Sequence, residues 1–283
     1  MSSSSYAHYS VWDQTVNIVY VVEMVFYCLI LFAAVAALFR RSQIATAAFL
    51  ILMAVLKICG LSIALDLAVR LVKSYNSGSL GRYYYWGGNA YDLAIAEVVL
   101  LSLSIAALVC ATVSLCFAGH WPIWTHILAY GLVALPAILY IVVYALVGSG
   151  VQYSVSKLIE AADVLYLALY VIIVITGGVM YAVQRKSSDG VRFVGMLTVM
   201  LAVPFFLVRL IYYIVNDFGT FLNITGWKFY LPLQVVMEFM VSLIYVVGLH
   251  FMITRHHRIA RTEVEIGDES TEGTKSHPTQ AGP

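Results

Sequence analysis

Acidic side chains lie well inside the long apolar segments of this chain, where charged groups are rare. There are six of them, Glu23, Asp66, Glu97, Glu160, Asp163 and Glu238, and the opposing cations there are Lys57 and Arg209. A charge at mid-bilayer costs about 2.5–3.5 kcal/mol, so such residues usually face a bundle interior or a water-filled cavity. Counted at ~1.5 Å per residue, all but Lys57 fall in the same half of the membrane. We therefore expect one polar chamber near one membrane face.

The balance of charge in this chamber favours proton transfer. Six acids opposed by two cations cannot all ionise in a medium of low dielectric constant, because burial and like charge both favour the protonated carboxylic acid. A buried neutral carboxylic acid is a proton donor. The faces of nearby aromatic rings stabilise a positive charge as it develops. Together these features predict acid-initiated cyclisation of an isoprenoid or its epoxide.

Aromatic residues recur at spacings of three and four beside the acids, which places them on the same helix faces. Glu160, Asp163, Tyr166 and Tyr170 form one such stripe. The predicted catalytic residues are Glu23, Glu97, Asp163, Glu238 and Arg209. The predicted substrate-binding residues are Tyr27, Lys57, Trp86, Glu160, Tyr166, Tyr170, Tyr212 and Tyr245.

Structural roles are open for several of these residues. Asp66 and Arg70 form an i,i+4 pair near a helix end. Lys57 has the charge to neutralise a buried acid, and Glu160 and Asp163 have the charge to offset a helix dipole at its N-terminus. Aromatic residues at span ends commonly form an interfacial belt.

The elements that position these residues are membrane-spanning helices. Of 283 residues, 62% are hydrophobic and 11% charged, and the net charge is +1. A soluble domain carries about 25% charged residues, so soluble, disordered and nucleic-acid-binding proteins are excluded. Runs long enough to cross ~30 Å of hydrocarbon predict an all-α domain at 16–254, a polar tail at 1–15 and a disordered tail at 255–283. The seven runs are 16–39, 43–69, 90–117, 123–147, 156–183, 193–213 and 229–253.

The distribution of Lys and Arg predicts the orientation of the domain. The loops and tail that hold Arg40, Arg41, Arg185 and Arg255 carry more positive charge than the alternate loops. We therefore expect the N-terminus outside or in the lumen and the C-terminus in the cytosol. The expected location is the endoplasmic reticulum membrane.

Motifs typical of other membrane proteins are missing from the sequence. No Asp-Asp-x-x-Asp or Asn-Asp-x-x-Asp cluster is present to hold magnesium and a diphosphate, and the seventh segment has no lysine for a retinal Schiff base. Histidines and cysteines lack metal-ligand spacing. We expect no metal, no cofactor and no nucleic-acid partner. The expected partners are the bilayer and a hydrophobic isoprenoid substrate.

Four segments resemble a family of fungal seven-span membrane proteins. They are 22–27 (VEMVFY), 56–60 (LKICG), 204–212 (PFFLVRLIY) and 237–241 (MEFMV). Similar small seven-span fungal proteins include the membrane-bound terpene cyclases of ascochlorin and ascofuranone biosynthesis, which belong to meroterpenoid secondary metabolism. The resemblance implies an isomerase-type cyclase acting on an epoxide at the end of a farnesyl chain attached to a phenol.

The leading hypothesis is therefore a cofactor-free membrane terpene cyclase. In it, Glu97, Asp163 or Glu238 protonates the epoxide, Glu23 or another ionised carboxylate accepts a proton, and Arg209 fixes the ionisation state of an acidic neighbour. The alternative is a seven-helix receptor or transporter whose acidic chamber binds a cation, an amine or a proton. A third possibility is a purely structural membrane protein, in which the acids pair off and leave no cavity.

Overall fold

The computed structural model describes residues 15–40, 43–76, 89–117, 123–148, 155–184, 190–218 and 227–273. These residues are helical except at positions 40, 43 and 117, which form turns or bends. The helices are α1 (Thr15–Phe39), α2 (Ile44–Asn76), α4 (Asn89–Cys116), α5 (Ile123–Gly148), α6 (Val155–Gln184), α7 (Gly190–Phe218), α8 (Trp227–Tyr230), the π-helix η2 (Leu231–Val236) and α9 (Met237–Gly273). The predicted all-α fold class is confirmed for this part of the chain.

Seven segments are long and apolar enough to cross a membrane, as the sequence predicts. Their outward surfaces are rich in large apolar side chains, with Phe32 72% exposed and Leu201 60% exposed. Charged and hydroxyl side chains lie inside instead, including Lys57 and Arg209 at 0% exposure. Such a surface suits a lipid bilayer, where apolar side chains face hydrocarbon and polar groups must be satisfied internally. The chain is a multi-pass integral membrane protein.

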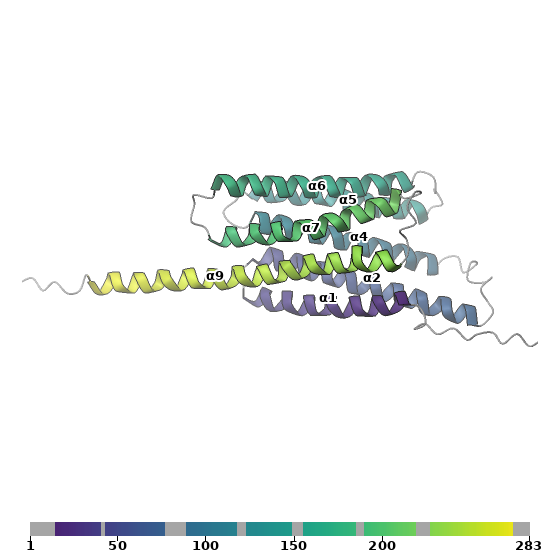
Figure 1. Cartoon of the computed structure of the whole chain (residues 1–283), viewed down its shortest axis with the longest axis horizontal. Coiled ribbons are helices and arrows are strands. Elements are labelled where there is room, and N and C mark those ends of the chain that lie inside the picture. Colours follow the sequence, from purple (N-terminus) through teal and green to yellow (C-terminus); the bar gives the residue numbers. More distant parts are fainter. Residues whose placement is uncertain are drawn as a thin grey trace, which may run out of the picture.

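The helices pack mainly against their neighbours in sequence, in a bundle with two layers (Figure 1). In one layer α1 and α2 lie beside α9, and contacts between α1 and α9 join the two ends of the chain. The other layer holds α5, α6 and α7. Helix α4 contacts α2, α5, α6 and α7, and so lies between the layers. Its buried face is rich in small residues, including Ser104, Ala107, Ala111 and Thr112, which let neighbouring helices approach closely.

Two boundaries differ from the sequence prediction. Helix α2 continues to Asn76, past the predicted end at position 69. Helix α9 continues to Gly273, whereas composition predicts disorder from position 255. No proline occurs between 232 and 278, and the segment contains Arg, Glu and Ile, which a helix accommodates. The segment therefore forms a helix, although it has too few apolar residues to span a membrane.

Candidate functional site

Four charged side chains meet inside the bundle, and we call them the charged cluster: Glu23, Lys57, Arg209 and Glu238. They come from α1, α2, α7 and α9 respectively. The Lys57 Nζ atom lies 2.9 Å from Oε1 of Glu238 and 3.6 Å from Oε1 of Glu23. Arg209 binds the other oxygen of Glu238, Oε2, through both Nε and Nη2. Glu238 is therefore held by two cations at once, one on each carboxylate oxygen.

The charged cluster is buried and balanced. Its members are 0% or 1% exposed, and it contains two acids and two cations. Opposite charges in a medium of low dielectric constant attract strongly, and an ion left alone there costs several kcal/mol. The cluster therefore joins four helices through interactions that depend on one another. Within it the acids are not in excess, so the excess predicted from the sequence must lie with the other carboxyl groups.

Local structure explains how Glu238 reaches these partners. Pro232 lies in the first turn of η2, where it has no amide N–H to give to the helix. The chain forms a π-helix over Leu231–Val236, a geometry often found at functional sites. Glu238 follows directly in the first turn of α9, and Ser242 Oγ donates to its backbone carbonyl at 2.8 Å. Gln234 in η2 is buried, and its Nε2 lies 3.5 Å from the hydroxyl of Tyr213.

Tyrosine rings flank both cations of the charged cluster. The Lys57 ammonium lies 5.6 Å from the ring centre of Tyr27, and the Arg209 guanidinium lies 4.7 Å from that of Tyr213. Both distances are within the range of cation–π attraction. A third tyrosine contacts an acid of the cluster, since the Tyr230 hydroxyl donates to Glu23 Oε2 at 3.4 Å.

A second polar group, which we call the Asp163 cluster, joins α5 to α6 and comprises Asp163, Tyr140 and Tyr166. The Tyr140 hydroxyl donates to Oδ1 of Asp163, which is 4% exposed. The Tyr140 ring stacks on that of Tyr166 with centres 6.0 Å apart, and on that of Tyr144 at 6.3 Å. The Tyr166 hydroxyl is buried, interacts electrostatically with Asp163, and has no hydrogen-bond partner among the described residues. A buried donor without a partner costs about 1–3 kcal/mol.

Further tyrosines surround the charged cluster. The Tyr213 ring lies against Arg209 of the charged cluster, and its hydroxyl lies 3.5 Å from Nε2 of Gln234. The Tyr20 ring lies edge-on to that of Tyr230, with ring centres 6.2 Å apart. Glu97 of α4 is half-buried. We refer to the two clusters, these tyrosines and Glu97 together as the polar network.

Other predicted site residues lie apart from this network. Asp66 pairs with Arg70 at 2.8 Å, and both side chains are more than 40% exposed. Glu160 lines a separate pocket on α6 together with Lys157. Tyr245 shares a 2.7 Å hydrogen bond with Thr112.

The remaining predicted aromatic residues have different surroundings. Tyr170 packs edge-on against Phe206 with ring centres 4.5 Å apart. Tyr212 is buried, at 7% exposure, and interacts electrostatically with Tyr213. Trp86 is outside the residues that the structure describes.

Sequence reasoning did not find the role of Tyr140. The predicted span that contains Tyr140 has no Asp or Glu, so no carboxyl group on that span indicated a role for this tyrosine. The available signal was the spacing of Tyr140 and Tyr144 one turn apart on a single helix face.

Across the described ranges, no three His, Cys, Asp or Glu side chains lie together as a metal site. Compared with known proteins, the chain matches no family model, no curated protein and no solved structure.

Proposed function

We propose that this chain is a membrane-bound terpene cyclase, which opens an epoxide on a farnesyl chain by general acid catalysis and releases an isomer of its substrate. The observation that carries the proposal is the Tyr166 hydroxyl, which is buried without a hydrogen-bond partner among the described residues, on the helix turn that follows Asp163 in α6. A donor beside a carboxyl group is suited to bind an oxygen atom that the same carboxyl group protonates. Stacked tyrosine rings beside it suit a carbocation.

In this proposal Asp163 is the acid. Glu238 is bound by Lys57 and Arg209, and an ionised carboxylate held by two cations has no proton to give. Lys57 and Arg209, the two interior cations identified in the sequence, are both paired with acids of the charged cluster. Asp163 accepts a hydrogen bond from the Tyr140 hydroxyl and lies beside the stacked rings of Tyr140 and Tyr166, and we assign it the protonated form.

The chemical steps balance without a cofactor. Asp163 gives its proton to the epoxide oxygen while Tyr166 donates a hydrogen bond to it, and the C–O bond breaks to leave a carbocation. A carbon–carbon double bond of the same chain attacks the cation and closes a ring. A carboxylate then removes a proton from the product cation, and Glu23, 3.6 Å from the Lys57 ammonium, is our candidate. Return of that proton from Glu23 to the Asp163 carboxylate restores the starting state of the enzyme. The product has the formula of the substrate.

The membrane supports this chemistry by holding an apolar substrate beside the bundle. We place the network end of the bundle toward the lumen and the C-terminus in the cytosol, following the Lys and Arg distribution. We assign the protein to the endoplasmic reticulum of a fungus and to meroterpenoid biosynthesis, from the resemblance of its sequence segments.

A product assay tests the proposal. Membranes that contain the protein, incubated with an epoxyfarnesyl phenol in ¹⁸O-labelled water, are expected to form a product of unchanged mass that contains no ¹⁸O. Membranes lacking the protein serve as the control. A labelled diol would instead identify an epoxide hydrolase, and no protein-dependent product from a panel of epoxyfarnesyl phenols would contradict the proposal.

One observation favours the alternative of a proton transporter. The bundle interior holds buried acids from several helices, including Glu23, Asp163 and Glu238, and chains of acids inside membrane bundles often relay protons. The charged cluster is less suited to bind a cation or an amine as ligand, because it already contains as many cations as acids. The product assay separates the two hypotheses, since a transporter forms no isomer.

A further inference from the structure

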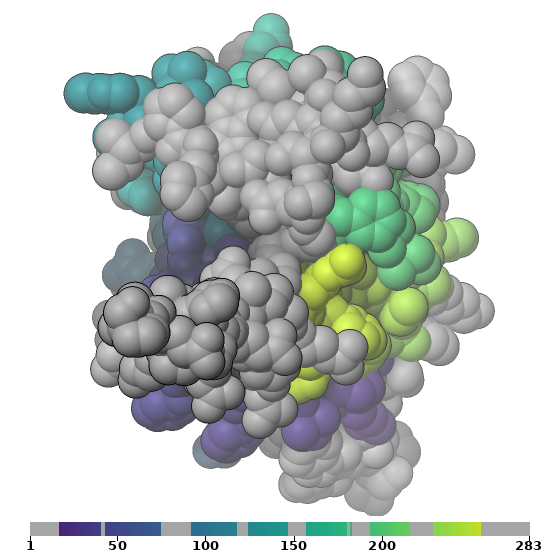
Figure 2. Space-filling view, turned by 90° about the vertical axis from the view of Figure 1, so that its left-hand side faces the viewer, coloured from purple at the N-terminus to yellow at the C-terminus, as the bar shows by residue number. Residues whose placement is uncertain are grey.

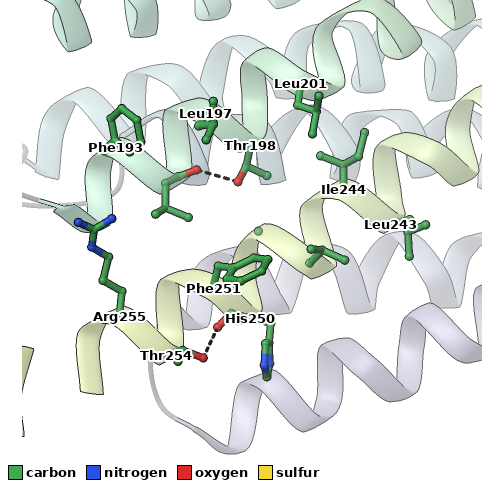
Figure 3. Close-up of a pocket in the computed structure, with 13 residues that line it drawn as sticks. Phe193, Leu197, Thr198, Leu201, Leu243, Ile244, His250, Phe251, Thr254 and Arg255 are labelled. Carbon is green, nitrogen blue, oxygen red and sulfur yellow. Dashed lines mark hydrogen bonds between the residues drawn. The ribbon is translucent and has the colours of Figure 1, made fainter. Parts of the chain in front are cut away.

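A groove runs along the seam between α7 and α9, away from the polar network (Figure 3). Its volume is about 1130 Å³. Phe193, Leu197 and Leu201 of α7 face Leu243, Val247 and Phe251 of α9 across it. All six side chains are between 38% and 60% exposed, so the groove opens on the lipid-facing surface of the bundle. No member of the charged cluster or the Asp163 cluster lines it.

The groove exists because the two helices meet through small residues. A Cβ atom on Gly248 would lie only 2.2 Å from Oγ1 of Thr198, so the backbones approach closely at this point. Gly248 contributes no side chain, and the hydroxyl of Thr198 is turned to its own helix, donating to Val194 O at 2.7 Å. The floor is therefore narrow, and the larger side chains on either side form its walls.

One end of the groove is cationic. Arg255 lines it and is exposed, and Figure 3 shows its side chain reaching from α9 toward Phe193 on α7. His250 also lines the groove and lies 3.5 Å from Nη1 of Arg40, measured from its Nδ1 atom. Figure 2 looks onto this end of the bundle, where yellow atoms of α9 lie between green atoms of α7 and purple atoms of α1.

We propose that the groove binds an anionic phospholipid, with one acyl chain along the α7–α9 seam and the phosphate at Arg255. Twelve helical steps separate Leu243 from Arg255, and at ~1.5 Å per step they extend over ~18 Å. One leaflet of a bilayer has about 15 Å of hydrocarbon, half of the total. A chain in the groove thus brings its headgroup to Arg255, where basic side chains attract anionic lipids. A neutral isoprenoid phenol has no negatively charged group to pair with Arg255.

Lipid binding to the full chain tests this assignment independently of any enzymatic activity. The purified protein is incubated with phosphatidylglycerol or phosphatidylcholine of identical acyl chains, and retained lipid is measured by native mass spectrometry. We expect phosphatidylglycerol to bind about fivefold more tightly, the size of effect that one arginine has near an anionic surface. Arg255→Gln should remove this preference, whereas Lys73→Gln, at the opposite end of the bundle, should keep it.

A second pair of variants tests the groove itself. Leu201→Trp places bulk in the groove at a side chain that is 60% exposed and should reduce retention of both lipids. Ile175→Trp makes the same kind of change at a 59% exposed position on α6 and should leave retention unchanged. Equal retention of the two lipids by the unaltered protein would overturn the proposal. So would a persistent preference in Arg255→Gln, or equal retention by the two tryptophan variants.

Discussion

Replacing Glu238 with glutamine is expected to destabilise the folded bundle by about 3–5 kcal/mol, the cost of removing one partner from a buried ion pair. The substitution preserves shape but removes the charge that Lys57 and Arg209 share. Two buried cations would then have Glu23 as the one remaining acid of the charged cluster. The free energy of unfolding, measured by detergent titration in mixed micelles, checks the expectation.

The matched control is Asp66→Asn. Asp66 also bonds an arginine at 2.8 Å, but both side chains are substantially exposed. An exposed pair contributes at most about 1 kcal/mol, so this variant should stay close to the original stability. The double variant Glu238→Gln, Lys57→Gln restores the balance of charge and should lose less stability than the two single changes added together. Strict additivity would show that the four charges do not act as one cluster.

Replacing Asp163 with asparagine is expected to lower the rate of isomer formation at least about 100-fold, because general acid catalysis contributes roughly 10²–10⁴. Asparagine fills the same space and still accepts the hydrogen bond from Tyr140, but it has no acidic proton. The initial rate of product formation in membranes, normalised to the amount of folded protein, is the measurement.

Two further variants separate the loss of the acid from a loss of folding. Asp92→Asn removes a carboxyl group from an exposed position in the first turn of α4 and should leave the rate unchanged. Tyr166→Phe removes the buried hydroxyl without a hydrogen-bond partner and should fold at least as stably while the reaction slows. A fully active Asp163→Asn variant would remove Asp163 from the mechanism.

The helical bundle could be predicted from the sequence because one physical constraint dominates it. A span must be long and apolar, and each of the seven predicted runs corresponds to such a helix. Its ends are less constrained, since polar residues with helical propensity extend a helix into water. Helices α2 and α9 both continue past their predicted ends for this reason.

The candidate site was predictable in part. The cost of burying charge identified Glu23, Lys57, Arg209 and Glu238 one by one, and the structure brings these four together. Which acid faces which cation depends on the rotation of each helix about its axis, and composition does not fix that rotation. Depth alone therefore grouped Glu160 with the interior acids, whereas it lines a separate pocket with Lys157.

Infrared spectroscopy of the carboxyl C=O stretch tests whether the acid is Asp163, without requiring a substrate. The unaltered protein in lipid should show the band of a buried protonated carboxylic acid at neutral pH. This band should disappear in Asp163→Asn and persist in Glu238→Gln, because Glu238 is ionised between Lys57 and Arg209. A band that persists in Asp163→Asn and disappears in Glu238→Gln would contradict the division of roles between the two clusters.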